Sequence, residues 1–196
     1  MRRFLKTICL VVAAVVATTA INAQDLQSQR GESQDLGEIL GHKVDHGGLI
    51  INPYPQKLLM LRSLPVDITK GVKLVGEAKS YAEETGFVKH AKKGVKLTIK
   101  FDELANEISG AYQLVINGNA IEIVADGDAG AFYAIQTLRQ IVESPISAEG
   151  KLPAMSISDW PDLKYRGVVE GFYGEPWSHE TRLSLIDFYG RFKMNY

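Results

Sequence analysis

The residues best suited to chemistry lie near the end of the chain, in a glycine-aromatic run that starts at Glu170. The rings of Phe172 and Tyr173 can stack on the apolar faces of a sugar, and the tyrosine hydroxyl can bond a sugar hydroxyl. Gly171 lets the backbone come close to a ligand. Glu170 is a candidate general acid, but glycoside hydrolysis usually needs a second carboxyl group, and none stands out nearby. A pairing of Glu170 with an arginine such as Arg166 is the alternative.

Other hydrolytic and metal-binding patterns are missing from the sequence. There is no G-x-S-x-G elbow and no H-E-x-x-H helix, and the glycine-aromatic run lacks the lysine and the spacing of a phosphate-binding loop. His42 and His46 are four residues apart, but the neighbouring glycines disfavour a helix and no third ligand is close. The sequence therefore predicts neither a metal nor another cofactor.

The glycine-aromatic run follows a short apolar segment, Val168-Val169, that is typical of a buried parallel strand. Ser178 is a suitable N-cap for a helix that extends to about Gly190, and residues 191–196 look like the approach to a further strand. This order predicts one βα unit followed by the start of a second. In α/β barrels the functional residues lie at the carboxyl ends of the strands, which is where the glycine-aromatic run is expected.

The preceding part of the chain predicts a small α+β domain over residues 49–159. Strands are expected where apolar and polar residues alternate or β-branched residues cluster: over 57–64, 95–101, 112–116, 121–124 and 155–157. Residues 72–81 are ambiguous. Asn117-Gly118 indicates a hairpin turn. Asp128 is a suitable N-cap for a helix over about 129–142, whose regularly spaced apolar residues predict one face packed on the sheet.

The first 23 residues differ from the rest and predict export. A basic start precedes an uncharged stretch from Thr7 to Ala20, which is shorter than the roughly 20 apolar residues of a membrane span. Residues 1–23 therefore match a signal peptide, with an uncleaved N-terminal anchor as the alternative. Periplasm, cell surface and medium all stay open as destinations. Residues 24–48 are polar and glycine-rich and predict a flexible leader.

The charge of the chain argues against nucleic acid as a partner. The sequence has 22 basic and 23 acidic residues, and loss of the signal segment with its three basic residues would leave a net charge of −4. No basic stripe is evident along the sequence. The one cysteine, Cys9, lies within the signal segment, so the exported chain would hold no disulfide.

The end of the chain resembles the family-84 glycoside hydrolases, which are β-N-acetylglucosaminidases that include O-GlcNAcases. The residues that carry this resemblance are Arg166-Gly167-Val168-Val169-Glu170-Gly171-Phe172-Tyr173-Gly174, Pro176-Trp177-Ser178, Arg182 and Met194-Asn195-Tyr196. Residues 111–141 resemble part of the small α/β domain that precedes the catalytic barrel in families 84 and 20. The resemblance implies a small α+β domain followed, over residues 160–196, by the first βα unit of a TIM (β/α)8 barrel. Such a barrel takes about 250 residues, so a longer protein is expected.

The resemblance also implies removal of β-linked N-acetylglucosamine from glycans or glycoproteins. In this family the acetamido oxygen of the substrate attacks the anomeric carbon to give an oxazoline, assisted by an adjacent Asp-Asp pair. The sequence contains no such pair, so the catalytic residues are expected beyond Tyr196 and the isolated chain is expected to be inactive. Gly171 and Tyr173 match family positions that contact the sugar, with Phe172 between them. Glu170 matches a position that is neither the acid nor the base.

Two other functions remain as alternatives. A non-catalytic carbohydrate-binding module is disfavoured because a partial barrel exposes apolar surface. A structural or interaction protein that uses only residues 49–159 is disfavoured because such a protein has no need of the glycine-aromatic run.

Overall fold

The computed structural model describes residues 47–104, 108–171, 174 and 176–196. The chain divides into two units, Met1–Val44 and Asp45–Tyr196, and the described residues all belong to the second. The predicted signal peptide, most of the predicted leader, His42 and His46 lie outside the described residues. The fold below is therefore that of the second unit.

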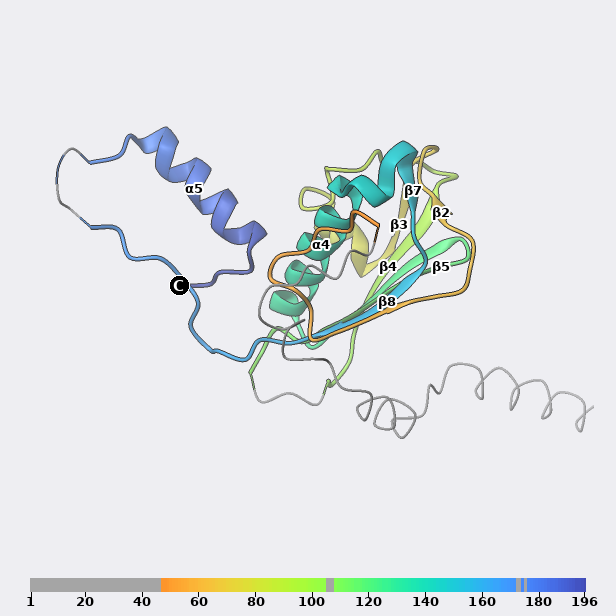
Figure 1. The fold of residues 1–196 in the computed structure, drawn as a ribbon, viewed down its shortest axis with the longest axis horizontal. Helices are drawn as coiled ribbons and strands as arrows, with labels where there is room; N and C mark the ends of the chain where they lie inside the picture. Colours follow the sequence, from red (N-terminus) through yellow and green to blue (C-terminus); the bar gives the residue numbers. More distant parts are fainter. Residues whose placement is uncertain (1–46, 105–107, 172–173, 175) are drawn as a thin grey trace, which may run out of the picture. The chain divides into compact units, whose positions relative to one another are not determined.

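A six-stranded mixed sheet forms the centre of this unit (Figure 1). Its strands, in order across the sheet, are β1 (Lys57–Met60), β8 (Met155–Asp159), β5 (Tyr112–Asn117), β6 (Ala120–Ala125), β4 (Val95–Phe101) and β3 (Val72–Gly76). The three strands β3, β4 and β6 are parallel, and the remaining neighbours pair antiparallel. The short strands β2 (Val66–Asp67) and β7 (Lys151–Leu152) form a separate antiparallel pair. The small mixed α+β domain predicted from the sequence is confirmed.

Most of the predicted strands occur, with differences at their ends. Strand β4 has the predicted bounds, β1 is shorter than predicted, and β8 continues to Asp159. The ambiguous residues 72–81 divide into strand β3 and a 3-10 helix, η2 (Glu77–Tyr81). A second 3-10 segment, η3 (Pro145–Gly150), leads into β7.

The β5–β6 hairpin forms, but its turn lies one residue later than predicted. Asn117 pairs with Ala120 as the last pair of the ladder, so Gly118 and Asn119 are the two loop residues. Gly118 has a φ of 59°, a left-handed conformation that glycine adopts without steric cost. Glycine with positive φ at the first loop position is typical of a type II′ turn, whose twist matches that of the strands.

Helix α4 (Asp128–Glu143) covers one face of the sheet and packs on β5 and β6 (Figure 1). Ile135, Leu138 and Ile141 recur at three-residue intervals and are almost completely buried. Facing them are the inward residues of the strands, among them Leu97, Ile99, Leu114, Ile116, Ile121, Ile123, Met155 and Ile157. The predicted packing of one helical face on the sheet is confirmed, and it forms the main hydrophobic core.

The predicted N-cap of this helix is wrong by one residue. Gly127 is the N-cap, and Asp128 is the first helical residue, without a side-chain cap bond. The Asp128 carboxylate accepts a hydrogen bond of 2.6 Å from the Tyr81 hydroxyl, so it ties η2 to α4. Burial and this hydrogen bond raise the pKa of Tyr81 well above its ordinary value. The Asp128 side chain is thus engaged in a tertiary contact rather than a local one.

The opposite face of the sheet carries lysines. Lys96 and Lys100 on β4 are exposed, and Lys73 on β3 lies beside Lys96 in the strand register. The sequence shows no run of basic residues, and the prediction that nucleic acid is not a partner stays a prediction. Net charge sums over the whole chain, whereas the period-two alternation of strands gathers these cations on one face.

The strand predicted at Val168-Val169 does not form. Both residues lie in an irregular segment, and Val169 is 93% exposed. The carbonyl of Arg166 accepts hydrogen bonds from the backbone N–H groups of Asn195 (2.7 Å) and Tyr196 (3.0 Å). A parallel strand needs hydrogen-bonding neighbours along its length and cover on both faces, and the described residues supply neither at Val168-Val169. The predicted first unit of a barrel therefore has its helix but not its strand.

The predicted helix after Ser178 is confirmed as α5 (His179–Arg191). The Ser178 hydroxyl caps it by accepting a hydrogen bond of 3.2 Å from the Thr181 N–H. Several of its apolar residues are exposed, among them Leu183, Ile186 and Phe188. Two ion pairs of 3.9 Å link its later turns to α4, one between Asp187 and Arg139 and one between Arg191 and Glu143.

We predict that Gly130→Ala destabilises the domain although alanine is the better helix former. An added Cβ at Gly130 would lie 2.3 Å from the Ala111 carbonyl oxygen, where α4 approaches the sheet. We expect this overlap to lower the free energy of unfolding by about 1–3 kcal/mol, which outweighs the intrinsic helical gain of about 1 kcal/mol. Thermal denaturation followed by circular dichroism measures the effect.

The matched control is Gly127→Ala, because no atom lies within 4 Å of a Cβ added there and the residue is extended. This variant should melt close to the wild type. Equal midpoints for the two variants would contradict a tight helix–sheet contact at Gly130.

Candidate functional site

The predicted sugar-binding residues are only partly described. Gly171 lies at the end of the irregular segment and is exposed, whereas Phe172 and Tyr173 lie outside the described residues. Trp177, just before α5, is 46% exposed. Their predicted role in sugar binding stays a prediction, so the described geometry concerns how Gly171 and its neighbours are held.

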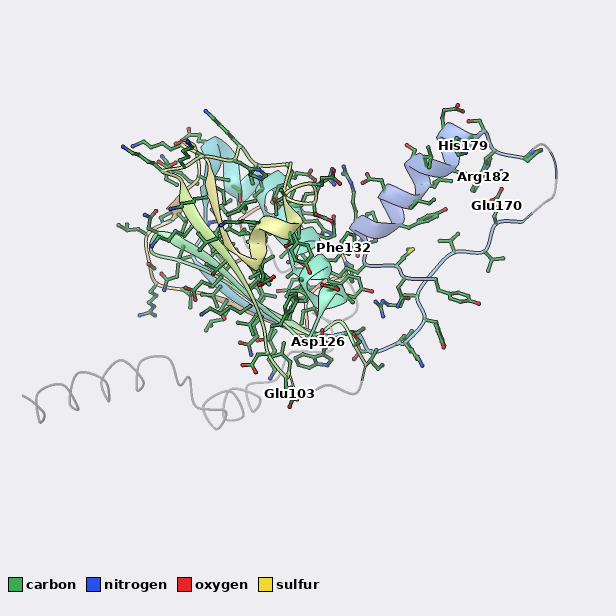
Figure 2. All side chains as sticks on the ribbon, turned by 180° about the vertical axis from the view of Figure 1, so that it is seen from behind. Glu103, Asp126, Phe132, Glu170, His179 and Arg182 are labelled. Atoms are coloured by element: carbon green, nitrogen blue, oxygen red, sulfur yellow. The ribbon has the colours of Figure 1, made fainter. Side chains whose placement is uncertain are left out.

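Glu170 pairs with Arg182, not with Arg166 as the sequence suggested. The Arg182 guanidinium donates two hydrogen bonds to the Glu170 carboxylate, at 2.8 and 3.3 Å, and joins the irregular segment to the first turns of α5 (Figure 2). These hydrogen bonds, together with the charge of Glu170, raise the pKa of Arg182. Both carboxylate oxygens of Glu170 are engaged by Arg182, which suits a positioning role for Glu170 better than that of a proton donor.

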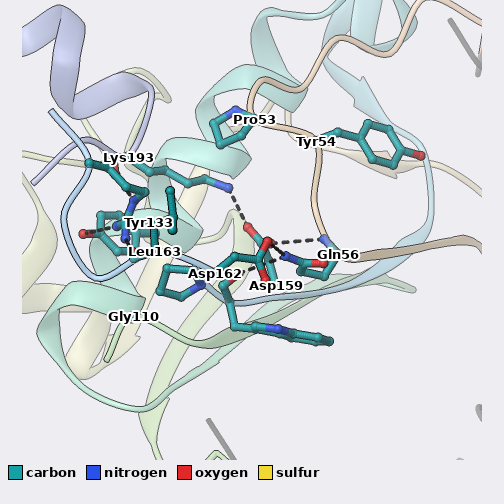
Figure 3. Close-up of a pocket in the computed structure, with 12 residues that line it drawn as sticks. Pro53, Tyr54, Gln56, Gly110, Tyr133, Asp159, Asp162, Leu163 and Lys193 are labelled. Atoms are coloured by element: carbon teal, nitrogen blue, oxygen red, sulfur yellow. Dashed lines mark hydrogen bonds and ion pairs between the residues drawn. The ribbon is translucent and has the colours of Figure 1, made fainter. Parts of the chain in front are cut away.

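A buried ion pair connects the residue that ends β8 with the residues that follow α5. The Lys193 ammonium lies 2.7 Å from Oδ2 of Asp159 (Figure 3). It also lies 2.9 Å from the Tyr112 hydroxyl oxygen. The Tyr112 hydroxyl also bonds Asp159 Oδ2 at 2.9 Å and Thr137 Oγ1 at 2.6 Å. Gln56 donates its backbone N–H to Asp159 Oδ1 at 3.1 Å. We call Lys193, Asp159, Tyr112 and Thr137 the anchor.

Burial shapes the electrostatics of the anchor. The side chains of Lys193 and Asp159 are only 5% and 11% exposed. Burial lowers the pKa of Lys193, and the Asp159 charge opposes that shift. Burial, with the Asp159 charge, raises the pKa of Tyr112. Because each member bonds another, the pair escapes the cost of an unpaired buried charge, and its geometry specifies where residue 193 must lie.

The backbone at Lys193 is bent to make this contact. Lys193 has a φ of 59°, in the left-handed region that costs a residue with a Cβ roughly 1–2 kcal/mol. Hydrogen bonds from Lys193 N–H to the Gly190 carbonyl and from Met194 N–H to the Tyr189 carbonyl form a Schellman ending of α5. Glycine usually occupies this position. A lysine there indicates that the side-chain contact offsets the backbone cost.

Arg166 and Gln140 hold the residues on either side of Lys193 and the segment before Gly171. The Arg166 guanidinium donates to the Tyr133 hydroxyl at 2.9 Å and to the Lys193 carbonyl at 3.0 Å, and it stacks 5.3 Å above the Tyr133 ring. Gln140 on α4 donates to the carbonyl of Arg191, at the end of α5, at 2.8 Å. The segment that leads to Gly171 is therefore tied at its start to α4 and to the anchor.

A pocket lies beside the anchor (Figure 3). Tyr54, Gln56, Trp160 and Asp162 are among its lining residues, and the Gln56 amide donates to the Asp162 carboxylate at 2.6 Å. Its volume of about 200 Å³ is below the roughly 300–1,000 Å³ of typical ligand sites. The Gln56–Asp162 bond also engages two of its polar groups, so we assign no ligand to this pocket.

No group of three or more His, Cys, Asp or Glu side chains among the described residues is arranged to hold a metal ion. Within the same part of the chain, no helix has the length and apolar character needed to cross a membrane.

Sequence reasoning missed the anchor, although part of it had a signal. Met155, Ile157 and Asp159 are two residues apart and share the inward face of β8, so alternation already predicts a buried Asp159. In the same way Tyr112 shares the inward face of β5 with Leu114. Lys193 had no such signal, because its partner lies 34 residues away and on another element.

We predict that Lys193→Met strongly destabilises the described unit. The substitution leaves the buried Asp159 carboxylate without its cation, which typically costs about 3–5 kcal/mol of unfolding free energy. The double variant Asp159→Asn, Lys193→Met removes both charges and should lose markedly less. Urea denaturation followed by circular dichroism gives these values.

Lys164→Met is the control, because Lys164 is an exposed lysine that pairs with no carboxylate among the described residues. A loss below about 1 kcal/mol for Lys193→Met, equal to that of the control, would show that the anchor is not a stabilising contact.

Two family models match consecutive parts of the chain. The model described as "Glycosyl hydrolase family 20, domain 2" matches residues 49–160, which contain the whole six-stranded sheet and α4. The model described as "beta-N-acetylglucosaminidase" matches residues 166–196, which contain α5 and Lys193. The anchor thus joins residues of one match, Asp159 and Tyr112, to a residue of the other.

Two named bacterial proteins are similar to the chain. The chain is 33% identical over 141 residues to "N,N'-diacetylchitobiase" of Vibrio harveyi, covering 66% of this chain and 16% of the relative. The chain is 34% identical over 101 residues to "Beta-hexosaminidase" of Vibrio vulnificus, covering 52% of this chain and 11% of the relative. Among solved structures, "CpGH84B" superposes with a TM-score of 0.62 at 30% identity, over 75% of this chain and 29% of that one.

The chain spans less than a third of each of these relatives. The resemblance to family 84 stays a prediction, because the model that covers most of the chain is one of family 20. That match extends over more than half of the 196 residues. This chain therefore belongs to the family described as glycosyl hydrolase family 20, domain 2.

Proposed function

We propose that this chain is part of a glycoside hydrolase that removes β-linked N-acetylglucosamine from glycans or glycoproteins. The observation that carries the proposal is the succession of the two matches, a family-20 domain 2 followed after five residues by a β-N-acetylglucosaminidase segment. The printed names of the relatives, a diacetylchitobiase and a β-hexosaminidase, point to the same substrate class.

The contacts of the described residues support a shared role for the two matched parts. The anchor binds the residues that follow α5 to the sheet domain, and the Arg166–Tyr133 contact binds the segment that precedes Gly171 to it. Glu170 is held by Arg182 rather than left free for proton transfer. In the proposed enzyme the sheet domain acts as a support that positions the start of the sugar-binding wall, formed by Gly171, Phe172 and Tyr173.

The finer mechanism follows the resemblance to family 84. We propose that the acetamido oxygen of the substrate attacks the anomeric carbon, while a carboxylic acid protonates the departing aglycone oxygen. Water then opens the oxazoline and restores the acetamido group, with retention of configuration. The adjacent Asp-Asp pair for these steps would be supplied outside these 196 residues, whose sequence contains none. A catalytic TIM barrel that begins in residues 160–196 belongs to the same proposal.

The test is hydrolysis of a chromogenic aryl β-N-acetylglucosaminide by the full-length product of the gene. We expect turnover of this substrate and none of the aryl β-glucoside, which lacks the acetamido nucleophile. Stepwise fluorination of the acetyl group should lower the rate steeply, because it withdraws electron density from the attacking oxygen. The 196-residue chain alone should leave the substrate intact.

Three results would contradict the proposal. Equal hydrolysis of the glucoside would exclude substrate assistance, and a rate insensitive to fluorination would exclude the acetamido oxygen as nucleophile. No hydrolysis of any N-acetylglucosaminide by the full-length product would leave a non-catalytic carbohydrate-binding or structural role as the better account.

We also propose that the protein is exported. Its support is the basic start and the uncharged stretch of residues 1–23. Amino-terminal sequencing of protein recovered from the periplasm, the cell surface or the medium is expected to begin at Gln24. A mature protein that retains Met1 in the membrane fraction would instead indicate an uncleaved anchor.

A further inference from the structure

We propose that the sheet face opposite α4 binds a linear polysaccharide that carries repeating carboxylate or sulfate groups. This surface, the lysine face, contains Lys73 on β3 and Lys96 and Lys100 on β4, with Thr98 and Gln113 among its polar residues. The inference goes beyond the proposed hydrolysis and needs no catalytic group.

Strand register places the three lysines on one face. Lys96 and Lys100 alternate along β4 with the buried Val95, Leu97 and Ile99, so they point away from α4. Lys73 pairs with Lys96 in the parallel β3–β4 ladder and so points to the same side. Neighbouring strands are about 4.8 Å apart, and four residues along a strand span about 13 Å. A linear chain that runs along β4 can therefore meet all three ammonium groups.

These lysines lack anionic partners within the described part of the chain. No carboxylate there lies within 4.0 Å of Lys73, Lys96 or Lys100. Lys73 and Lys96 lie directly opposite each other on adjacent strands. Like charges in such a pair are destabilising. Glu122, opposite Thr98, is the acidic residue that β6 contributes to this face. The face therefore keeps an excess of positive charge, which a bound anion would relieve.

Protection of a sheet edge does not account for the pattern. Lysines often keep an edge strand from pairing with another chain, and β3 is an edge strand. Lys96 and Lys100, however, lie on β4, which is paired on both sides by β3 and β6. The charge is concentrated on an interior strand, where it guards no edge.

The chemistry of the face favours an acidic polysaccharide over nucleic acid or lipid. The residues that alternate onto it from the six strands include no aromatic ring for stacking on bases and no arginine. Its apolar residues next to the lysines, such as Val115 and Val124, are half-buried and do not project as a lipid-inserting group would. The exposed Leu59 is on β1, at the sheet edge opposite β3, as is Lys57, whose ammonium lies 5.5 Å from the Trp160 ring. The Thr98 hydroxyl and the Gln113 amide have no hydrogen-bond partner among the described residues and can bond sugar hydroxyls.

The test compares binding of the 196-residue chain to chondroitin sulfate, dextran sulfate and neutral dextran by isothermal titration calorimetry. The triple variant K73Q/K96Q/K100Q removes three charges from the lysine face. The control variant K79Q/K151Q/K164Q removes three exposed charges that lie on η2, on β7 and after Asp162. Circular dichroism checks that both variants keep the fold, which is expected because all six side chains are exposed.

We expect wild type and control to bind both anionic polymers, more weakly as ionic strength rises, and not to bind neutral dextran. The lysine-face variant should bind at least about tenfold more weakly, because it loses three charges that attract an anionic partner. Equal weakening in both variants, or equal binding of neutral dextran, would overturn the proposal. Selective binding of phosphatidylserine vesicles or of a single-stranded oligonucleotide, with neither acidic polysaccharide bound, would overturn it in favour of those partners.

Discussion

The buried ion pair between Lys193 and Asp159 is the contact on which the arrangement of the described residues depends. It joins the last residue of β8 to the turn that ends α5, and Tyr112 and Thr137 complete its hydrogen bonds. A buried pair gives little net stability compared with apolar packing, but it tolerates only one geometry because a misplaced charge is costly. The left-handed backbone at Lys193 is consistent with this constraint, since the chain accepts local strain to bring the ammonium to Asp159.

The two faces of the sheet have different roles. One face is covered by α4 and supplies the core. Helix α4 also holds the segment before Gly171 through Tyr133 and the end of α5 through Gln140. The other face stays open and carries Lys73, Lys96 and Lys100. Support of the proposed sugar-binding wall and contact with an acidic polymer would thus use opposite sides of one domain.

Much of this fold could be predicted because its signals are local. Alternation over residues 95–101 marked β4, the glycine after Asn117 marked a hairpin, and Ser178 marked the start of α5. Local signals failed where a tertiary contact competed. Asp128 bonds Tyr81 instead of capping its helix. Val168-Val169 has the composition of a strand but finds no strand to pair with among the described residues.

For the candidate site, the sequence by itself determined the glycine-aromatic run, the type of residue that could meet a sugar, and the small domain that precedes it. Only the tertiary structure decided that Glu170 pairs with Arg182, that Lys193 is buried against Asp159, and that lysines gather on one sheet face. The reason is physical. Periodicity and capping act within a few residues, whereas an ion pair or a charged face depends on which distant segments the packed core brings together.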